Sequence, residues 1–452
     1  MKLIANSLFC LFLFFLISGC SFDKKNRLGV WTGVNEKKRA AELEIEQGKE
    51  LINIYSTKKQ SLPEVKSNNV IKISKPQNNS SWQTSNLNLQ NYTGNIYLSG
   101  IDFVFLKKKI GKNKFKLSRA MSSPVIFEDN IIFADDVGTI YNVNKRGKIR
   151  WKINIYKKVY KKIYKTLTFS ISNNIIYASD NIGFVYSVDL NTGKILWIKN
   201  QGVALKSELK VFEDKIFLVN QDNRIICLDI NNGSKLWDIR MVASFIKMQN
   251  FLPLAISKEG ALVVLTSSGD LMRINANTGK ISWSLNTTPS AFAHDTDFFN
   301  SSSIVITDNE IIFFAFNTIF SFNLDNGRNN WRERISSTIT PVVDGTNIFF
   351  VSDNGFFVTL NRNSGKIIRS SNILKILKTR NQETKITGFV MGSSKIYATT
   401  RNGFLIICSP ATGKVEGFKK IGGEINSSPI ISDGSLFILT EKSKIFGLTS
   451  KI

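Results

Sequence analysis

Histidine and cysteine, on which zinc sites and His-dependent catalysis rely, are scarce in this sequence. The 452 residues include one histidine and four cysteines. The histidine, His294, stands beside Asp295 and Asp297, and these could form a small metal cluster, but three such residues on one loop are weak grounds for a site. Cys227 and Cys408 lie within apolar runs, so buried free thiols are expected there rather than a disulfide or a nucleophile. We therefore expect no catalytic residue, no metal and no cofactor.

Cys20 is the residue whose surroundings predict covalent chemistry. An apolar run from Leu8 to Ile17 is too short to span a bilayer and is typical of a signal peptide. It leads into Leu-Ile-Ser-Gly-Cys at 16–20, the pattern of a bacterial lipobox, in which the cysteine thiol takes up a diacylglycerol. We expect removal of residues 1–19 and a lipid anchor on Cys20. An ordinary secretory signal with a chance cysteine is the alternative.

The elements that follow divide into a tether and a body. Residues 20–81 are polar and rich in Lys, Asn, Ser and Glu, which predicts a flexible, lipid-anchored tether. Residues 82–452 are expected to form the folded domain. Residues 82–106 carry alternating apolar positions, including Trp82, Tyr92 and Tyr97, and are expected to lie along this body near the point where it closes.

A repeat fills the folded domain. A glycine followed four residues later by a tryptophan recurs five times and continues in weaker form at Gly365 and Gly413, with successive glycines 38–48 residues apart. This spacing suits four short strands and their turns. Within each unit, apolar strands alternate with turns rich in Asp, Asn and Gly. The tryptophans are expected to be structural plates where neighbouring units pack: Trp151, Trp197, Trp237, Trp283 and Trp331.

The number of repeats predicts a closed ring. The eighth copy stops at Thr449, before any outer strand, whereas Gly111–Phe115 near the N-terminus has the same glycine-to-aromatic spacing. We therefore predict an all-β fold, an eight-bladed β-propeller of four-stranded antiparallel blades, in which an N-terminal outer strand completes the C-terminal blade and leaves no free edge. The copies start near these residues: Ser122, Thr166, Ser207, Pro253, Ser303, Thr340, Thr387 and Ser428.

The charge is strongly positive but dispersed. The chain has 60 Lys+Arg against 35 Asp+Glu, a formal net charge of +25. Nucleic-acid binding requires a clustered basic face, which this distribution does not predict, so we expect no nucleic-acid partner. One local run, Lys157–Lys165, could contact lipid headgroups or an acidic partner, or be a solvated loop.

The repeated unit resembles a known propeller repeat. The segment SDNIGFVYSVDLNTGKILW at 179–197 is similar to the pyrroloquinoline-quinone-type repeat, and the similarity extends over residues 111–449. Together with the lipobox and the polar tether, it resembles the BamB family of outer-membrane protein assembly factors. The resemblance implies a noncatalytic scaffold, lipid-anchored on the periplasmic face of the outer membrane. It would bind the POTRA domains of a BamA-like Omp85 protein, with other lipoproteins of the BAM complex as further partners, and assist folding and insertion of β-barrel proteins.

The same resemblance implies partner-binding residues in two neighbouring inter-blade segments. Phe245, Ile246 and Lys247 match a hydrophobic-basic pattern, although the family's Gly-rich continuation is absent. Asp295 and Asp297 match an Asp-x-Asp pattern, although a longer link follows. Apolar anchors contribute most of the binding in such patches and charges set orientation. Ordinary solvated loop residues are the alternative.

Two other functions stay open. A quinone-dependent dehydrogenase of this repeat type would require a pair of adjacent cysteines, a calcium site, a catalytic Asp and long loops, and the sequence has no Cys-Cys pair. A different envelope-anchored propeller that binds polysaccharide or protein would share the fold, which cannot discriminate between these functions.

Overall fold

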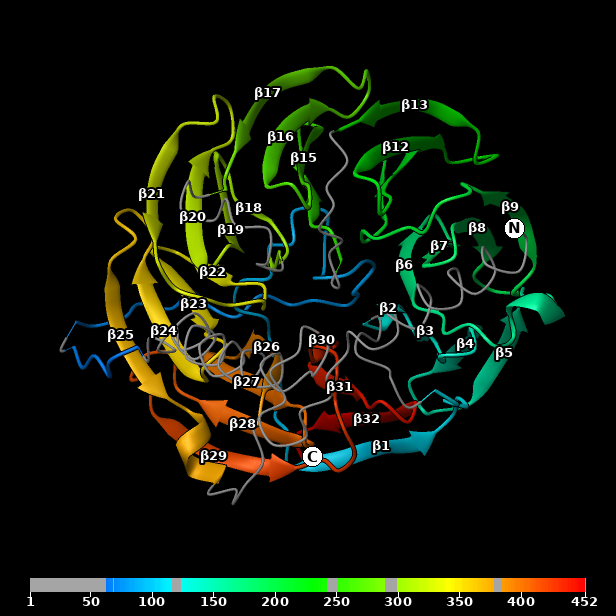
Figure 1. Cartoon of the computed structure of the whole chain (residues 1–452). Coiled ribbons are helices and arrows are strands. Elements are labelled where there is room, and N and C mark those ends of the chain that lie inside the picture. Colours follow the sequence, from blue (N-terminus) through cyan, green and yellow to red (C-terminus); the bar gives the residue numbers. More distant parts are fainter. Residues whose placement is uncertain are drawn as a thin grey trace, which may run out of the picture. The chain divides into compact units, whose positions relative to one another are not determined.

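The chain folds as a ring of blades around a central axis (Figure 1). The structure is a computed structural model that describes residues 62–67, 69–115, 123–241, 251–288, 299–377 and 384–451. These residues form eight four-stranded antiparallel sheets, which confirms the predicted eight-bladed propeller. The helices among them are the 3-10 turns η1 (Lys158–Tyr160) and η3 (Leu374–Leu377). No helix in the described ranges is long and apolar enough to cross a membrane.

In the first seven blades the strands follow the chain from the inner edge to the outer edge, whereas in the eighth the outer strand comes first in the chain. In chain order the blades are β2 (Val125–Phe127), β3 (Asn130–Ala134), β4 (Thr139–Asn144), β5 (Ile149–Asn154); β6 (Leu167–Ser172), β7 (Ile175–Asp180), β8 (Phe184–Asp189), β9 (Ile195–Asn200); β10 (Lys210–Phe212), β11 (Lys215–Val219), β12 (Arg224–Asp229), β13 (Lys235–Arg240); β14 (Leu254–Ile256), β15 (Ala261–Leu265), β16 (Asp270–Asn275), β17 (Ile281–Asn286); β18 (Val305–Ile306), β19 (Glu310–Ala315), β20 (Thr318–Asn323), β21 (Asn329–Glu333); β22 (Val342–Asp344), β23 (Asn347–Val351), β24 (Phe356–Asn361), β25 (Ile367–Asn372); β26 (Ile386–Gly392), β27 (Lys395–Thr400), β28 (Phe404–Cys408), β29 (Val415–Lys420); and β30 (Ile430–Ser432), β31 (Ser435–Leu439), β32 (Lys444–Thr449) with β1 (Phe103–Lys109).

The eighth blade closes the ring with a strand from the N-terminal side. β1 pairs antiparallel with β32, from Phe103 opposite Thr449 to Lys109 opposite Lys444. The predicted mode of closure is confirmed, but the predicted position, Gly111–Phe115, is wrong. That segment follows the strand, and the N–H groups of Lys114 and Phe115 donate to the Asp136 carboxylate instead of to a neighbouring strand.

The repeated tryptophans lie at the seams between blades. The indole Nε1 of each donates to a main-chain carbonyl of the following blade, over 2.6–3.3 Å. The face of each indole contacts the repeat glycine of that blade, where a Cβ would come within 3.0 Å of a ring atom. The five donor–acceptor pairs are Trp151–Leu190, Trp197–Ile230, Trp237–Ala276, Trp283–Leu324 and Trp331–Arg362.

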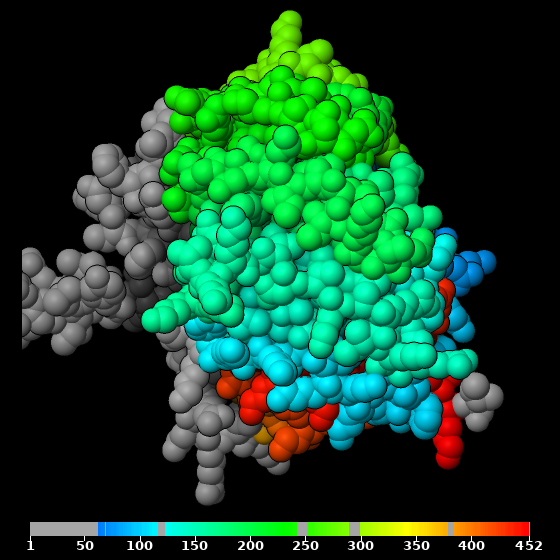
Figure 2. Space-filling model, turned by 90° about the vertical axis from the view of Figure 1, so that its right-hand side faces the viewer, coloured from blue at the N-terminus to red at the C-terminus, as the bar shows by residue number. Residues whose placement is uncertain are grey.

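The two faces of the ring carry different connections. Because adjacent strands of a blade are antiparallel, the turns from first to second and from third to fourth strand share one face, here called the turn face. The links from an outer strand to the inner strand of the next blade share the opposite face, here called the link face. Figure 2 shows the side of the ring, where the cyan-to-green blades follow one another in chain order.

Residues 74–99, here called the axial belt, cross the centre of the turn face (Figure 1). They form no regular strand and contact the inner part of every blade. Residue Val65, further toward the N-terminus, pairs with Ser370 of β25. Residues 62–81, assigned to the tether from sequence, thus lie against the blades in the structure. The belt contacts, blade by blade, are Trp82–Ile126, Thr84–Ser170, Ser85–Lys210, Leu89–Ile256, Gln90–Ile306, Ser74–Asp344, Ile96–Gly392 and Leu98–Gly434.

Candidate functional site

The expected partner-binding residues lie outside the described residues, as do His294 and the lipidation residue Cys20. The structure describes neither 242–250 nor 289–298, and these ranges contain Phe245, Ile246, Lys247, Asp295 and Asp297.

The structure describes the strands to which these two segments are attached. The first leaves β13 at Arg240 and returns to β14 at Leu254. The second leaves β17 at Asn286 and returns to β18 at Val305. Both run from an outer strand to the next inner strand, so both begin and end on the link face. The inner strands β14 and β18 contact each other. Two long links therefore attach to neighbouring blades on one face.

The lysine run is also a link on this face, between β5 and β6. Lys157, Lys158, Lys161 and Lys162 are exposed. Two apolar side chains among them are exposed as well, Val159 by 73% and Ile163 by 45%. The segment thus presents a mixed basic and apolar surface. Apolar side chains in a basic loop are compatible with either a protein or a lipid partner.

Lys165 ends the run but has a structural role. Its ammonium donates to the carbonyls of Tyr160 at 2.5 Å and Ile163 at 2.9 Å, and the residue is 2% exposed. Desolvation lowers the pKa of this ammonium. The hydroxyl of Tyr156 donates to Asp180 at 2.5 Å, and burial raises the pKa of that carboxyl. These contacts anchor the base of the link.

A buried ion pair lies beside the axial belt. Lys210 Nζ donates to the carbonyls of Ser85 and Asn88 and to Oδ1 of Asn91, at 2.6–3.0 Å. It lies 3.7 Å from the Glu208 carboxylate, which accepts from Asn86 Nδ2 at 3.1 Å. Burial lowers the pKa of Lys210 to about 8 and raises that of Glu208. The third blade thus holds the middle of the belt through charge-assisted bonds.

A small cavity lies beside the axial belt. The cavity between Trp82, Asn86 and the inner strands of three blades has a volume of about 20 Å³. Such a volume admits roughly one water molecule. The described residues also contain no group of three or more His, Cys, Asp or Glu placed to hold a metal ion. This one cavity is too small for a quinone cofactor.

The two thiols in the blades are not activated. Cys227 in β12 and Cys408 in β28 are both free and buried. Burial raises the pKa of each thiol to about 12. A nucleophilic cysteine needs a lowered pKa, so neither residue has the environment of a catalytic thiol.

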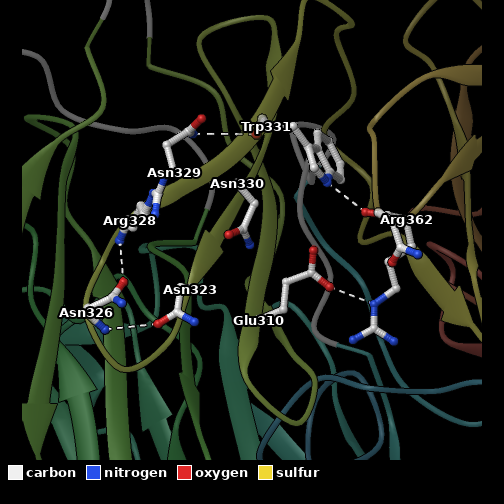
Figure 3. A pocket seen from close by; sticks show the side chains of 9 residues that line it. Glu310, Asn323, Asn326, Arg328, Asn329, Asn330, Trp331 and Arg362 are labelled. Atoms are coloured by element: carbon white, nitrogen blue, oxygen red, sulfur yellow. Dashed lines mark hydrogen bonds and ion pairs between the residues drawn. The ribbon is translucent and has the colours of Figure 1, made fainter.

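The sequence reasoning missed a polar groove on the turn face, at the seam between the fifth and sixth blades (Figure 3). Its volume is about 560 Å³. The Arg362 guanidinium donates to Glu310 at 2.6 Å across the seam. The available signal was Arg362 itself, because the other four tryptophan seams have an apolar residue at this position. The lining residues are Glu310, Asn323, Asn326, Arg328, Asn329, Asn330, Trp331, Arg362 and Asn363.

Comparisons with known proteins agree on the family. The family model described as outer membrane protein assembly factor BamB matches residues 136–371. The BamB protein of Moranella endobia is 21% identical over 305 residues, covering 60% of this chain and 71% of that protein. The Shewanella oneidensis BamB is 25% identical over 283 residues, covering 62% of this chain and 69% of its own length.

Solved structures share the fold at low identity. The crystal structure of BamB from Moraxella catarrhalis aligns with a TM-score of 0.61 and 15% identity, covering 76% of this chain and 100% of that one. The quinohemoprotein alcohol dehydrogenase of Comamonas testosteroni aligns with a TM-score of 0.64 and 10% identity, covering 82% of this chain and 81% of its own. Because a BamB protein and a dehydrogenase share this ring, the structural likeness shows the fold alone.

Proposed function

Because this chain belongs to the family of the outer membrane protein assembly factor BamB, we propose that it is a noncatalytic scaffold of the β-barrel assembly machinery. In this role it binds the POTRA domains of a BamA-like Omp85 protein and assists the folding and insertion of β-barrel proteins into the outer membrane. Other lipoproteins of the same machinery are further partners. The observation that carries the proposal is the pair of long links attached to neighbouring blades on the link face.

The docking residues in this proposal come from those two links. Phe245 and Ile246 supply apolar anchors, and Lys247 supplies a flanking positive charge. Asp295 and Asp297 supply negative charge from the next link. Truncation of central apolar anchors is usually the most costly change in a protein interface, while flanking charges set orientation and association rate. The two links together therefore form one composite docking surface.

The ring serves as a rigid support for that surface. Because β1 pairs with β32, the eighth blade has its outer strand where the ring closes. The belt contacts all eight blades from the opposite face, so partner docking and belt packing do not compete. A rigid support reduces the ordering cost of association.

A lipid on Cys20 holds the scaffold at the periplasmic face of the outer membrane. One acyl chain alone gives only marginal membrane binding, whereas several chains anchor stably. The polar segment after Cys20 lets the ring stand off the bilayer, within reach of soluble partner domains. The noncatalytic role agrees with the raised pKa values of both blade thiols.

Co-purification tests this function. A tagged chain is recovered from envelopes solubilised in mild detergent, and we expect a POTRA-bearing Omp85 protein to accompany it. The double variants Phe245→Ala/Lys247→Ala and Asp295→Asn/Asp297→Asn should each reduce recovery of that protein. The matched control is Glu213→Gln/Asp214→Asn, an exposed acidic pair on the turn face. Unchanged recovery in both link variants would remove the docking assignment, and absence of any Omp85 protein would remove the function.

A further inference from the structure

We propose that the groove at the seam between the fifth and sixth blades is a binding site for a saccharide. It lies on the turn face, where β20 turns into β21 and β24 turns into β25, and thus opposite the proposed docking surface. The proposal goes beyond the scaffold role and does not depend on it.

The repeats of the chain provide an internal comparison for this seam. At each tryptophan seam, the residue three positions before the repeat glycine provides the carbonyl that accepts from the indole of the preceding blade. In four seams this residue is buried and apolar: Leu190, Ile230, Ala276 and Leu324. In the fifth it is Arg362, whose carbonyl accepts from Trp331 Nε1 at 2.6 Å. The backbone geometry is kept while the apolar side chain is replaced by a guanidinium.

Two further positions at this seam also carry polar residues. Two residues after the repeat glycine, three tryptophan-bearing repeats have isoleucine, whereas the fifth blade has Asn329. Glu310 lies at the start of β19. At the corresponding position, the other seven repeats have a neutral or basic residue. Substitutions at separate places in the sequence therefore converge on a single seam and make it polar.

The charged pair in the groove is held firmly. Arg362 Nε donates to Glu310 Oε2 at 2.6 Å, and its Nη2 donates to Thr307 Oγ1 at 2.6 Å. The other carboxylate oxygen of Glu310 accepts from Ser321 Oγ, which in turn accepts from Asn330 Nδ2 at 3.0 Å. This network fixes the wall of the groove before any ligand arrives, which lowers the cost of ordering on binding.

The groove retains both donors and acceptors that the protein leaves open. Within the described residues, Nδ2 of Asn323, Nδ2 of Asn326 and the Arg328 guanidinium donate no hydrogen bond. Oδ1 of Asn329, of Asn330 and of Asn363 likewise accepts none among these residues. Figure 3 shows Asn323, Asn326, Asn329 and Asn330 around the groove, with Glu310 and Arg362 at its right-hand side.

This inventory distinguishes between classes of ligand. An anion would need donors alone, and a metal cation would need acceptors alone. A hydroxyl both donates and accepts, so a polyhydroxylated ring fits a lining of mixed amide groups. The volume of about 560 Å³ is within the range of small-molecule sites. Trp331 is 8% exposed and offers little ring face for stacking, so we expect weak binding through hydrogen bonds.

Calorimetric titration of the purified chain tests the site. The probes are the N-acetylglucosamine trisaccharide and maltotriose, with triglutamate and inorganic phosphate as anionic comparisons. We expect saturable binding of at least one trisaccharide and none of the anions. Asn326→Ala/Asn363→Ala should weaken it by about tenfold, because two hydrogen bonds are removed. Asn232→Ala is the matched control, since Asn232 occupies the place of Asn326 in the third blade, and its affinity should equal that of the wild type.

Three outcomes would overturn the proposal. They are absence of saturable trisaccharide binding, equal affinity in the groove variant and the wild type, and tighter binding of an anionic probe. Because the titration contains no partner protein, its result is independent of Omp85 recovery. The groove variant should also retain full recovery of the Omp85 protein in co-purification.

Discussion

The indole face of Trp197 in the second blade packs against Gly233 in the third blade, at the seam between the two blades. A Cβ added to Gly233 would lie 2.6 Å from Cζ3 of Trp197. The indole Nε1 donates to the Ile230 carbonyl at 3.1 Å, so the ring plane and the turn are locked together. The same relationship recurs at each tryptophan seam, which makes glycine a packing requirement as well as a turn requirement.

Gly233→Ala should therefore destabilise the ring more than an ordinary glycine substitution. Gly233 has φ +67°, and the matched control Gly202 has φ +74° with no atom within 4 Å of its added Cβ. Positive φ costs both variants about 1–2 kcal/mol. Overlap with the indole should cost Gly233→Ala about 1–3 kcal/mol more. Urea unfolding measures both, and equal losses would show that the seam contact is unimportant.

Removing the charge of Lys210 alone should lower the free energy of unfolding more than replacing both Glu208 and Lys210. Lys210→Met removes the ammonium and leaves the Glu208 carboxylate buried without its cation, which should cost about 3–5 kcal/mol of unfolding free energy. Glu208→Gln in the same chain should recover much of this loss. Hydrogen exchange should show weaker protection at residues 82–99 in the single variant. Unchanged protection there would mean that Lys210 does not hold the axial belt.

Two carboxyl groups on the link face predict a pH dependence. Burial, followed by a hydrogen bond and charge repulsion from Glu424, raises the pKa of Glu441 to about 7. The folded state therefore holds a proton that the unfolded state releases near pH 4.5. The resulting stabilisation of the folded state is present below pH 4.5 and is lost as the pH rises through 7.

Glu441→Gln removes this titration. Its stability relative to the wild type should rise between pH 5 and pH 8, as followed by thermal unfolding at several pH values. Glu259→Gln, at an exposed position of the turn face, is the control and should leave the pH profile unchanged. A Glu441→Gln profile parallel to that of the wild type would contradict the assignment.

Cys20→Ser should abolish lipid attachment. Metabolic labelling with palmitate should mark the wild type and not this variant, and the variant should move from the membrane fraction to the soluble fraction. Cys227→Ser is the matched control, since that thiol is buried in β12, and it should keep both the label and the membrane location. Labelled Cys20→Ser would contradict the lipobox interpretation.

The repeat explains why so much of the ring was predictable. Gly233 and its equivalents occur at a regular spacing, and each signals the same turn, the same seam and the same four strands. The closing strand was misplaced because Gly111–Phe115 matches the glycine-to-aromatic spacing by chance, whereas β1 lies just before it and pairs with β32. Its own residues lack the turn signal that marks the other outer strands.

The axial belt and the groove escaped prediction for different physical reasons. The belt contacts each blade through isolated bonds, such as Trp82 with Ile126, and has no periodicity for a pattern to detect. The groove depends on Glu310 and Arg362, 52 positions apart, coming together across a seam. Their departure from the repeat is visible in the sequence, but only the fold brings them together.

Site-specific photo-crosslinking in cells tests the central claim most directly. A photoreactive phenylalanine analogue is placed at Ile246 or Asp297 in the proposed docking links, and at Glu213 or Asn363 on the turn face. The account predicts crosslinks to a POTRA-bearing Omp85 protein from the two link positions and none from the turn face. Crosslinks from the turn face alone would contradict the account.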